Sequence, residues 1–191
     1  MHVVAFNGSA RKDGNTAGLV RMVLDTLEQE NITTEHIQLG GSHIQGCLAC
    51  SKCFKNLDRH CSVDNDMLNQ YIDKMLDANG IIIGSPTYFA NVSTNIKSLI
   101  DRAGLVSKAN GDMLARKVGA AVVAVRRSGA IHVFNSINHF FLINQMIIPG
   151  SSYWNNGLGL HPGEVEKDEE GRQTMYNLGK NMSWLLRKLQ S

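Results

Sequence analysis

The chain lacks cysteine outside one segment of fifteen residues, Cys47 to Cys61, which reads CLACSKCFKNLDRHC. It also lacks a run of about 18 apolar residues, which excludes a transmembrane helix. The formal net charge is only +2, too small to indicate nucleic acid or a membrane as the main partner. The N-terminus has neither the charged region nor the cleavage site of a signal peptide, so we expect a cytoplasmic protein. Because thiols stay reduced there, the clustered cysteines are expected to be metal ligands or redox groups rather than structural disulfides.

Short apolar runs alternate with longer stretches of helical period, which is the pattern of a parallel sheet covered by helices. No internal repeat or low-complexity linker divides the 191 residues. We therefore predict one α/β domain over 1–191, with a cysteine-rich loop at about 41–63. The predicted strands are 2–6, 33–39, 80–85, 118–125 and, as the last, 146–150. The predicted helices are 15–29, 65–77, 93–105, 130–146 and 168–189.

The turn NGSARKDGNT (7–16) joins the first predicted strand to the first predicted helix. In open α/β sheets ligands bind beyond the carboxyl ends of the strands, and N–H groups at a helix N-terminus favour an anion. Ser9, Asn15 and Thr16 add hydroxyl and amide groups, and Arg11 adds a positive charge. The turn has neither the Gly-Lys-Ser/Thr of a P-loop nor the glycine spacing of a dinucleotide fingerprint. We predict a monophosphate site; the alternative is a turn that is merely rich in small residues.

A second turn, GSPTYFANVS (84–93), follows the third predicted strand. Pro86 fixes the chain in an extended turn. Thr87, Tyr88 and Phe89 then offer a hydroxyl, backbone amides and two aromatic faces at one place. This chemistry suits a flat heteroaromatic ring, held by ring contacts and by hydrogen bonds to its polar edge. The alternative is two aromatic side chains that pack beneath a loop.

These two turns and the later IKSLIDR (96–102) resemble the NADPH-dependent FMN reductase branch of the flavodoxin-like proteins over essentially the whole chain. The resemblance implies a flavodoxin-like doubly wound three-layer sandwich, whose five-stranded parallel sheet has the order 2-1-3-4-5, with FMN at the switch point. It also implies which residues bind FMN. The phosphate would be held by Ser9, Arg11, Asn15 and Thr16, and the isoalloxazine ring would be approached by Pro86, Thr87, Tyr88, Phe89, Val92, Arg127, Ser128 and Gly129. No side chain stands out as an obligatory general acid or base, so we predict no catalytic residue.

The cysteines have the spacing C-x2-C-x2-C-x7-C. Three thiolates at two-residue intervals can wrap one corner of a metal cluster, and a more distant fourth can close it, as in bacterial ferredoxins. Zinc sites usually pair two C-x2-C units across a longer spacer, so zinc fits less well. The pattern also resembles that of the iron–sulfur flavoproteins, which implies a [4Fe–4S] cluster on Cys47, Cys50, Cys53 and Cys61. The main alternative is free or redox-active thiols; zinc and a structural disulfide are less favoured.

The sequence therefore predicts an FMN-dependent oxidoreductase that passes electrons between FMN and a [4Fe–4S] cluster, with NAD(P)H or a ferredoxin-type carrier as donor. One alternative is an NAD(P)H-dependent flavin, quinone or nitro-compound reductase without a cluster. Another is a non-enzymatic binding protein whose thiols respond to redox state. The resemblance implies a homo-oligomer, a dimer or tetramer, that builds the flavin site at an interface. Lys52, Lys55, Arg59 and His60, interleaved with the cysteines, would offer an acidic ferredoxin-like carrier a docking patch; the alternative is a solvated polar loop.

Overall fold

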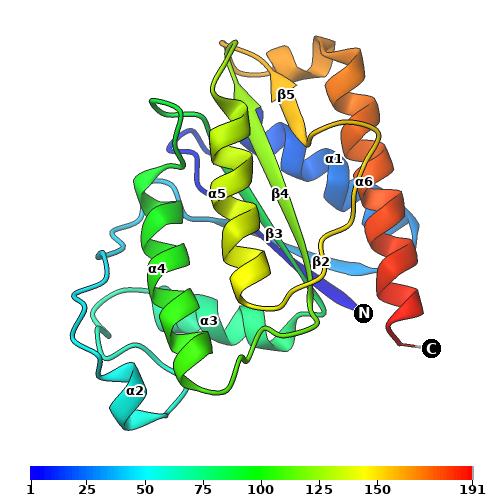
Figure 1. Ribbon diagram of the computed structural model, residues 1–191. Coiled ribbons are helices and arrows are strands. Elements are labelled where there is room, and N and C mark those ends of the chain that lie inside the picture. Colours follow the sequence, from blue (N-terminus) through cyan, green and yellow to red (C-terminus); the bar gives the residue numbers. More distant parts are fainter. Residues whose placement is uncertain (191) are drawn as a thin grey trace.

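A computed structural model describes residues 1–190 and shows a parallel sheet with helices on both faces (Figure 1). Its strands are β1 (His2–Asn7), β2 (Thr33–Gln38), β3 (Gly80–Pro86), β4 (Val118–Val125) and β5 (Asn156–Leu158). The order is β2-β1-β3-β4-β5, and every neighbouring pair is parallel. This confirms the predicted sheet and its order.

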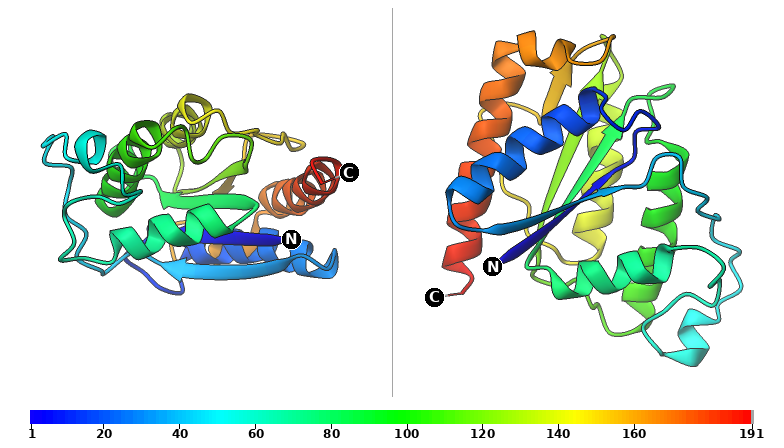
Figure 2. Two further views of the ribbon diagram at one scale, coloured as in Figure 1. Left: turned by 90° about the horizontal axis from the view of Figure 1, so that it is seen from below. Right: turned by 180° about the vertical axis from the view of Figure 1, so that it is seen from behind.

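The helices form two layers, one on each face of the sheet (Figures 1 and 2). They are α1 (Asn15–Gln29), α2 (Cys53–Asn56), α3 (Leu68–Asp77), α4 (Thr94–Ala109), α5 (Ala130–Ile143), the 3₁₀ turn η1 (Glu164–Lys167) and α6 (Glu169–Lys188). Helices α1 and α6 cover one face, and α3, α4 and α5 cover the other. None of the helices within residues 1–190 is long and apolar enough to cross a bilayer.

The central strands are apolar throughout because both of their faces are buried. In β3 the three isoleucines are fully buried and alternate between the two layers. Ile81 and Ile83 pack toward α3, α4 and α5, whereas Ile82 packs toward α1 and α6. The same alternation runs through β4. Such strands can be recognised in a sequence by their apolar content alone, which explains why their bounds were predicted closely.

The predicted last strand at 146–150 is wrong. In this segment only Ile147 meets the sheet, through an isolated parallel bridge to Val118. The fifth strand is instead Asn156–Leu158, which pairs with residues 123–125 at the far end of β4. Pro149 has no N–H to donate to a ladder. Because β5 is parallel to β4 and pairs with its last residues, the segment after β5 lies at the same edge of the sheet as the turns that follow β1, β3 and β4.

Candidate functional site

Hydrogen bonds tie the turn after β1 to the ends of β1 and β2. The Ser9 backbone N–H donates to Asn7 Oδ1 at 3.0 Å, and the Ser9 carbonyl accepts from Gln38 Nε2 at 2.6 Å. The Arg11 backbone N–H donates to Ser9 Oγ at 3.1 Å. Helix α1 begins without a side-chain cap and without an acidic residue in its first turn. Its exposed N–H groups and the positive end of its dipole are therefore available to an anion.

One cavity of about 210 Å³ brings the two predicted turns together. Its lining from these turns is Ser9, Arg11, Gly14, Asn15, Thr16, Pro86, Thr87 and Tyr88. All four residues predicted to hold a phosphate are thus beside three of those predicted to contact the ring. The turn after β3 is also rigid, because Tyr88 and Asn91 exchange two backbone hydrogen bonds of 3.0 Å.

The other residues predicted near the ring do not line this cavity. Val92 is buried in the core beneath α3, α4 and α5. Phe89 lies at the tip of its loop with its side chain fully exposed and a positive φ of 48°. Arg127, Ser128 and Gly129 lie in the neighbouring loop, and a Cβ placed on Gly129 would lie 3.1 Å from Ala90 Cβ. The third loop therefore touches the second, and the contact of these five residues with a flavin stays a prediction.

Five residues of the cavity were not among the predicted site residues: Gly14 in the first turn, and Ala124, Arg126, Gly159 and Leu160. Arg126 adds a second positive charge to that of Arg11, and the sequence signal for it was present, since it directly precedes Arg127 in RRSGA. Gly159 and Leu160 follow β5, so they were missed with that strand. Arg11 Nη1 lies 3.5 Å from the Leu160 carbonyl, so the turn after β1 contacts the segment after β5.

The residues of this cavity fit the two ends of FMN. Two arginines, the uncapped start of α1 and the hydroxyls of Ser9 and Thr16 suit a phosphate. Asn15 Oδ1 is buried without a hydrogen-bond partner among the described residues. The amide has a polar atom left over for a ligand, because a side-chain amide can present either its NH₂ or its oxygen. Pro86 and Tyr88 supply the flat apolar surface that a ring needs.

Gly40 packs directly against the backbone of Ser9 and Ala10 in the turn after β1. A Cβ at this position would lie 1.7 Å from the Ser9 carbonyl oxygen and 2.7 Å from the Ala10 nitrogen. Because these atoms belong to the backbone, Gly40→Ala is expected to displace the turn, to weaken FMN binding, and to lower the free energy of unfolding by about 1–3 kcal/mol. Fluorescence titration with FMN and urea denaturation measure the two effects. Gly46→Ala is the control, since its Cβ would meet nothing within 4 Å; equal effects of the two substitutions would contradict the prediction.

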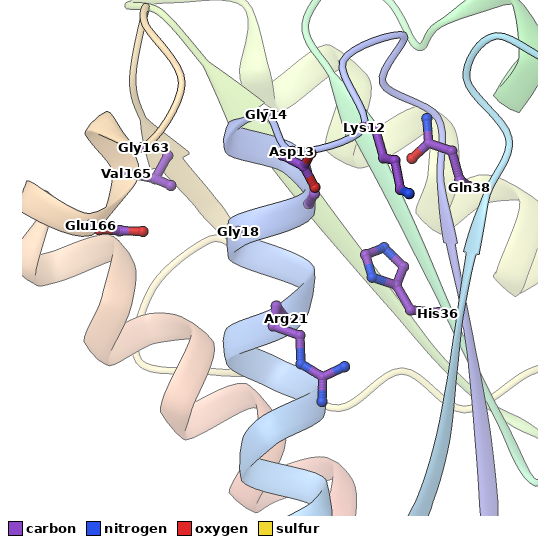
Figure 3. Close-up of a pocket in the computed structure, with 11 residues that line it drawn as sticks. Lys12, Asp13, Gly14, Gly18, Arg21, His36, Gln38, Gly163, Val165 and Glu166 are labelled. Atoms are coloured by element: carbon purple, nitrogen blue, oxygen red, sulfur yellow. The ribbon is translucent and has the colours of Figure 1, made fainter.

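A larger cavity, of about 330 Å³, lies along the side of α1 next to β2 (Figure 3). Lys12, Arg21 and His36 contribute to its lining. Arg21 is already paired with Asp25 at 2.6 Å and with Glu28 at 2.7 Å. Desolvation lowers the pKa of His36, and the charge of Arg21 lowers it further, so this imidazole is neutral at neutral pH. Since the cavity includes nothing from the turn after β3, we do not place the flavin there.

The cysteine-rich loop joins β2 to α3 and contains only the short helix α2 (Figure 1). All four cysteines are free, and all four line one cavity of about 220 Å³. Cys47 and Cys50 are exposed, whereas Cys53 and Cys61 are partly buried. The rest of the wall is largely apolar and includes Leu48, Phe54, Leu105 and Val106. The loop therefore places four thiols around one cavity that is partly open to solvent.

The thiols of this loop differ in their electrostatic surroundings. The Ser62 hydroxyl, 3.4 Å from the Cys50 sulfur, is the main cause of the lowered pKa of that thiol. Burial raises the pKa of Cys53. The backbone of the loop is strained, because four non-glycine residues in it have positive φ: Ala49, Ser51, Leu57 and Arg59.

The four thiols line one cavity, and which metal group they could hold is a matter of ligand chemistry. In residues 1–190, no three Cys, His, Asp or Glu side chains lie close enough together to hold a single metal ion. Thiolates on zinc all bind one atom, at about 2.3 Å. Those of a [4Fe–4S] cluster bind different irons and so lie further apart. The structure places four cysteines on one cavity, with no three Cys, His, Asp or Glu side chains of residues 1–190 grouped as a single-ion site.

The sheet order defines a flavodoxin-like fold, and a cavity lies beyond the carboxyl ends of β1 and β3, at its switch point. The NADPH-dependent FMN reductase family matches residues 1–160. An iron–sulfur flavoprotein of Methanocaldococcus jannaschii is 37% identical over 190 residues, which is 96% of each chain. One from Methanosarcina thermophila is 30% identical over 192 residues, covering 100% of this chain and 97% of its own.

Solved structures show the same fold. RosB, with a bound 8-demethyl-8-formylriboflavin-5'-phosphate intermediate, has a TM-score of 0.79 at 18% identity, over 100% of this chain and 80% of its own. A flavodoxin from the domain Archaea has a TM-score of 0.64 at 15% identity, over 98% of this chain and 99% of its own. The chain thus belongs to the NADPH-dependent FMN reductase family, in the branch of the iron–sulfur flavoproteins. It is an FMN-dependent oxidoreductase.

Proposed function

We propose that this protein holds FMN between the turns after β1 and β3, holds a [4Fe–4S] cluster in the cysteine-rich loop, and passes electrons between the two. The observation that carries the proposal is that all four cysteines of the chain line one cavity. The relatives named iron–sulfur flavoproteins, which match nearly the whole chain, support it. The cluster ligands would be Cys47, Cys50, Cys53 and Cys61.

The protein's own residues position and tune the flavin rather than react. When bound, FMN would supply the redox chemistry: it can exchange two electrons with a nicotinamide and single electrons with a metal centre. Arg11 and the start of α1 neutralise its phosphate, and Arg126 places a positive charge in the same cavity. Thr87 Oγ1 donates to the Ala124 carbonyl at 3.1 Å, so its hydroxyl fixes the ring-side loop to the end of β4.

The electron partners follow from charge and exposure. NAD(P)H is the donor that the family suggests. Lys52, Lys55 and Arg59 are all exposed on the cysteine-rich loop, close to the proposed cluster in the chain. They would attract an acidic carrier of the ferredoxin type and raise its rate of association, an effect that weakens with salt.

A homo-oligomer would complete the flavin site. The cavity of about 210 Å³ is smaller than the roughly 300–1,000 Å³ of ordinary ligand pockets. Beside it Tyr88 is 46% exposed and Phe89 fully exposed. A second copy of the chain, in a dimer or tetramer, would cover the ring on this open side.

A reductase without a cluster is the second candidate. It is favoured by the separation of the two cavities, which share no lining residue. Such a protein would use FMN and NAD(P)H in the same way and leave its thiols free.

The visible spectrum and the iron content of protein purified without oxygen test the proposal. We expect flavin bands superimposed on broad iron–sulfur absorption, with about four irons per chain. Flavin bands with negligible iron would support the reductase without a cluster. A colourless protein that takes up no FMN would contradict both.

A further inference from the structure

A buried arginine lies at the centre of the cysteine-rich loop, although it belongs to a different element. Arg102, on α4, is 1% exposed and lines the cavity of the four cysteines. Its guanidinium forms an ion pair with Asp66, with 2.5 Å between Nη1 and Oδ2 and no exposed surface on either side chain. The same Nη1 donates to the Gln45 carbonyl at 3.0 Å, and Nη2 donates to the Val63 carbonyl at 2.6 Å.

The Nε donor of the guanidinium points at a thiol. Arg102 Nε lies 3.3 Å from the sulfur of Cys61, the fourth cysteine of the motif. Gln45 and Val63, which the guanidinium also binds, flank the cysteine segment at its two ends. One side chain therefore ties both ends of the loop to α4 and directs an N–H group at one of the sulfurs.

Stability alone does not account for this arrangement. Removing a guanidinium and a carboxylate from water costs several kcal/mol each, and apolar residues of similar volume often stabilise a core as well or better. Asp66 offsets the charge of Arg102 and is itself held by the backbone N–H groups of Gln45 and Leu68, both at 3.0 Å. An apolar substitute would supply neither the hydrogen bonds to the Gln45 and Val63 carbonyls nor the charged donor beside Cys61.

We propose that Arg102 is a positioning and tuning residue for the cluster, an inference that rests on the proposed function. Its hydrogen bond to the Cys61 thiolate orients this ligand. It also favours the state in which the cluster has accepted one electron and carries one more negative charge. Hydrogen bonds to sulfur and local charge are known determinants of the potentials of iron–sulfur clusters. Arg102 therefore raises the reduction potential of the cluster.

Two substitutions that break the same ion pair from opposite sides test this role. Arg102→Gln removes the cation, whereas Asp66→Asn removes the anion and leaves Arg102 beside Cys61. We expect the midpoint potential of the cluster to fall in R102Q and to rise in D66N. It is measured by anaerobic dithionite titration followed by electron paramagnetic resonance. The midpoint potential of FMN, followed by absorbance, should not change in either variant.

Arg59→Gln is the control, because it removes an exposed charge from the same loop and should shift the cluster potential less than R102Q. Shifts of the same sign in R102Q and D66N, or none, would show that Arg102 only holds the loop and would overturn the inference. If R102Q retains no iron, D66N decides: a higher potential supports the role, and an unchanged or lower one overturns it. Wild-type protein with FMN but no cluster would instead overturn the proposed function itself.

Discussion

Replacing Cys47, Cys50, Cys53 and Cys61 together by serine is expected to remove essentially all iron and to leave FMN bound. A serine hydroxyl stays protonated at neutral pH and does not replace a thiolate as a ligand to iron–sulfur clusters. Residues 1–190 contain no group of three His, Asp or Glu side chains arranged to hold a metal ion in place of the thiols. The flavin is expected to stay because its cavity shares no lining residue with that of the cysteines. The iron content should fall from about four per chain to near zero.

Iron analysis and the ratio of FMN to protein measure this result, with Ser51→Ala in the same loop as the control. Retention of iron would exclude the cysteines as its ligands. Loss of FMN together with the iron would show that the loop also contributes to a flavin site, which is the outcome expected if a partner subunit places it there. Under the proposed function, turnover of NAD(P)H with an artificial acceptor should persist in the serine variant, since that reaction would need only the flavin.

Asn15→Asp is expected to weaken FMN binding at least 100-fold and, at the same time, to leave the ligand-free fold as stable or more stable. Asn15 is the first residue of α1 and lines the cavity. An acidic residue there interacts favourably with the helix dipole, by about 0.3–1 kcal/mol. The same carboxylate would stand against the phosphate, and two like charges about 4 Å apart near a protein surface repel by about 4 kcal/mol. Affinity and stability should therefore change in opposite directions.

Titration with FMN and with riboflavin, which has the same ring but no phosphate, separates the two ends of the site. Riboflavin binding should be the same in wild type and N15D, and the unfolding temperature of the ligand-free variant should not decrease. Equal losses for FMN and riboflavin would place Asn15 beside the ring and not the phosphate. A large loss of stability would show that the substitution disturbs the start of α1.

The sequence was informative where a buried face or a turn dictates residue type. The strands β3 and β4 are buried on both sides, so their apolar content was sufficient to recognise them. The turns after β1 and β3 carry donors and aromatic rings that have no role in a core, and the structure brings them to one cavity. The order of the strands in the sheet was predicted from the family resemblance, because no single element of the sequence indicates it.

Other features depend on tertiary contacts that a pattern does not show. The strand β5 has three residues, Asn-Gly-Leu, and only its pairing with β4 makes it a strand. The sequence does not show that Val92 turns into the core while Phe89, three residues earlier, points outward. Arg102 ends the IKSLIDR motif, but the sequence assigned it no role, because its burial arises only when a loop from elsewhere in the chain folds over it.

The left-handed residues of the cysteine-rich loop have a consequence for how long the protein survives. Ala49, Ser51, Leu57 and Arg59 each adopt a backbone conformation that costs a non-glycine residue on the order of 1 kcal/mol. A ligand that binds only the folded loop offsets this cost through mass action. Under the proposed function, a chain that has received iron and sulfide keeps the loop closed, whereas a chain that has not opens it more often and exposes it to proteases. Iron supply would then set the abundance of this protein through its rate of degradation, without any change in its synthesis.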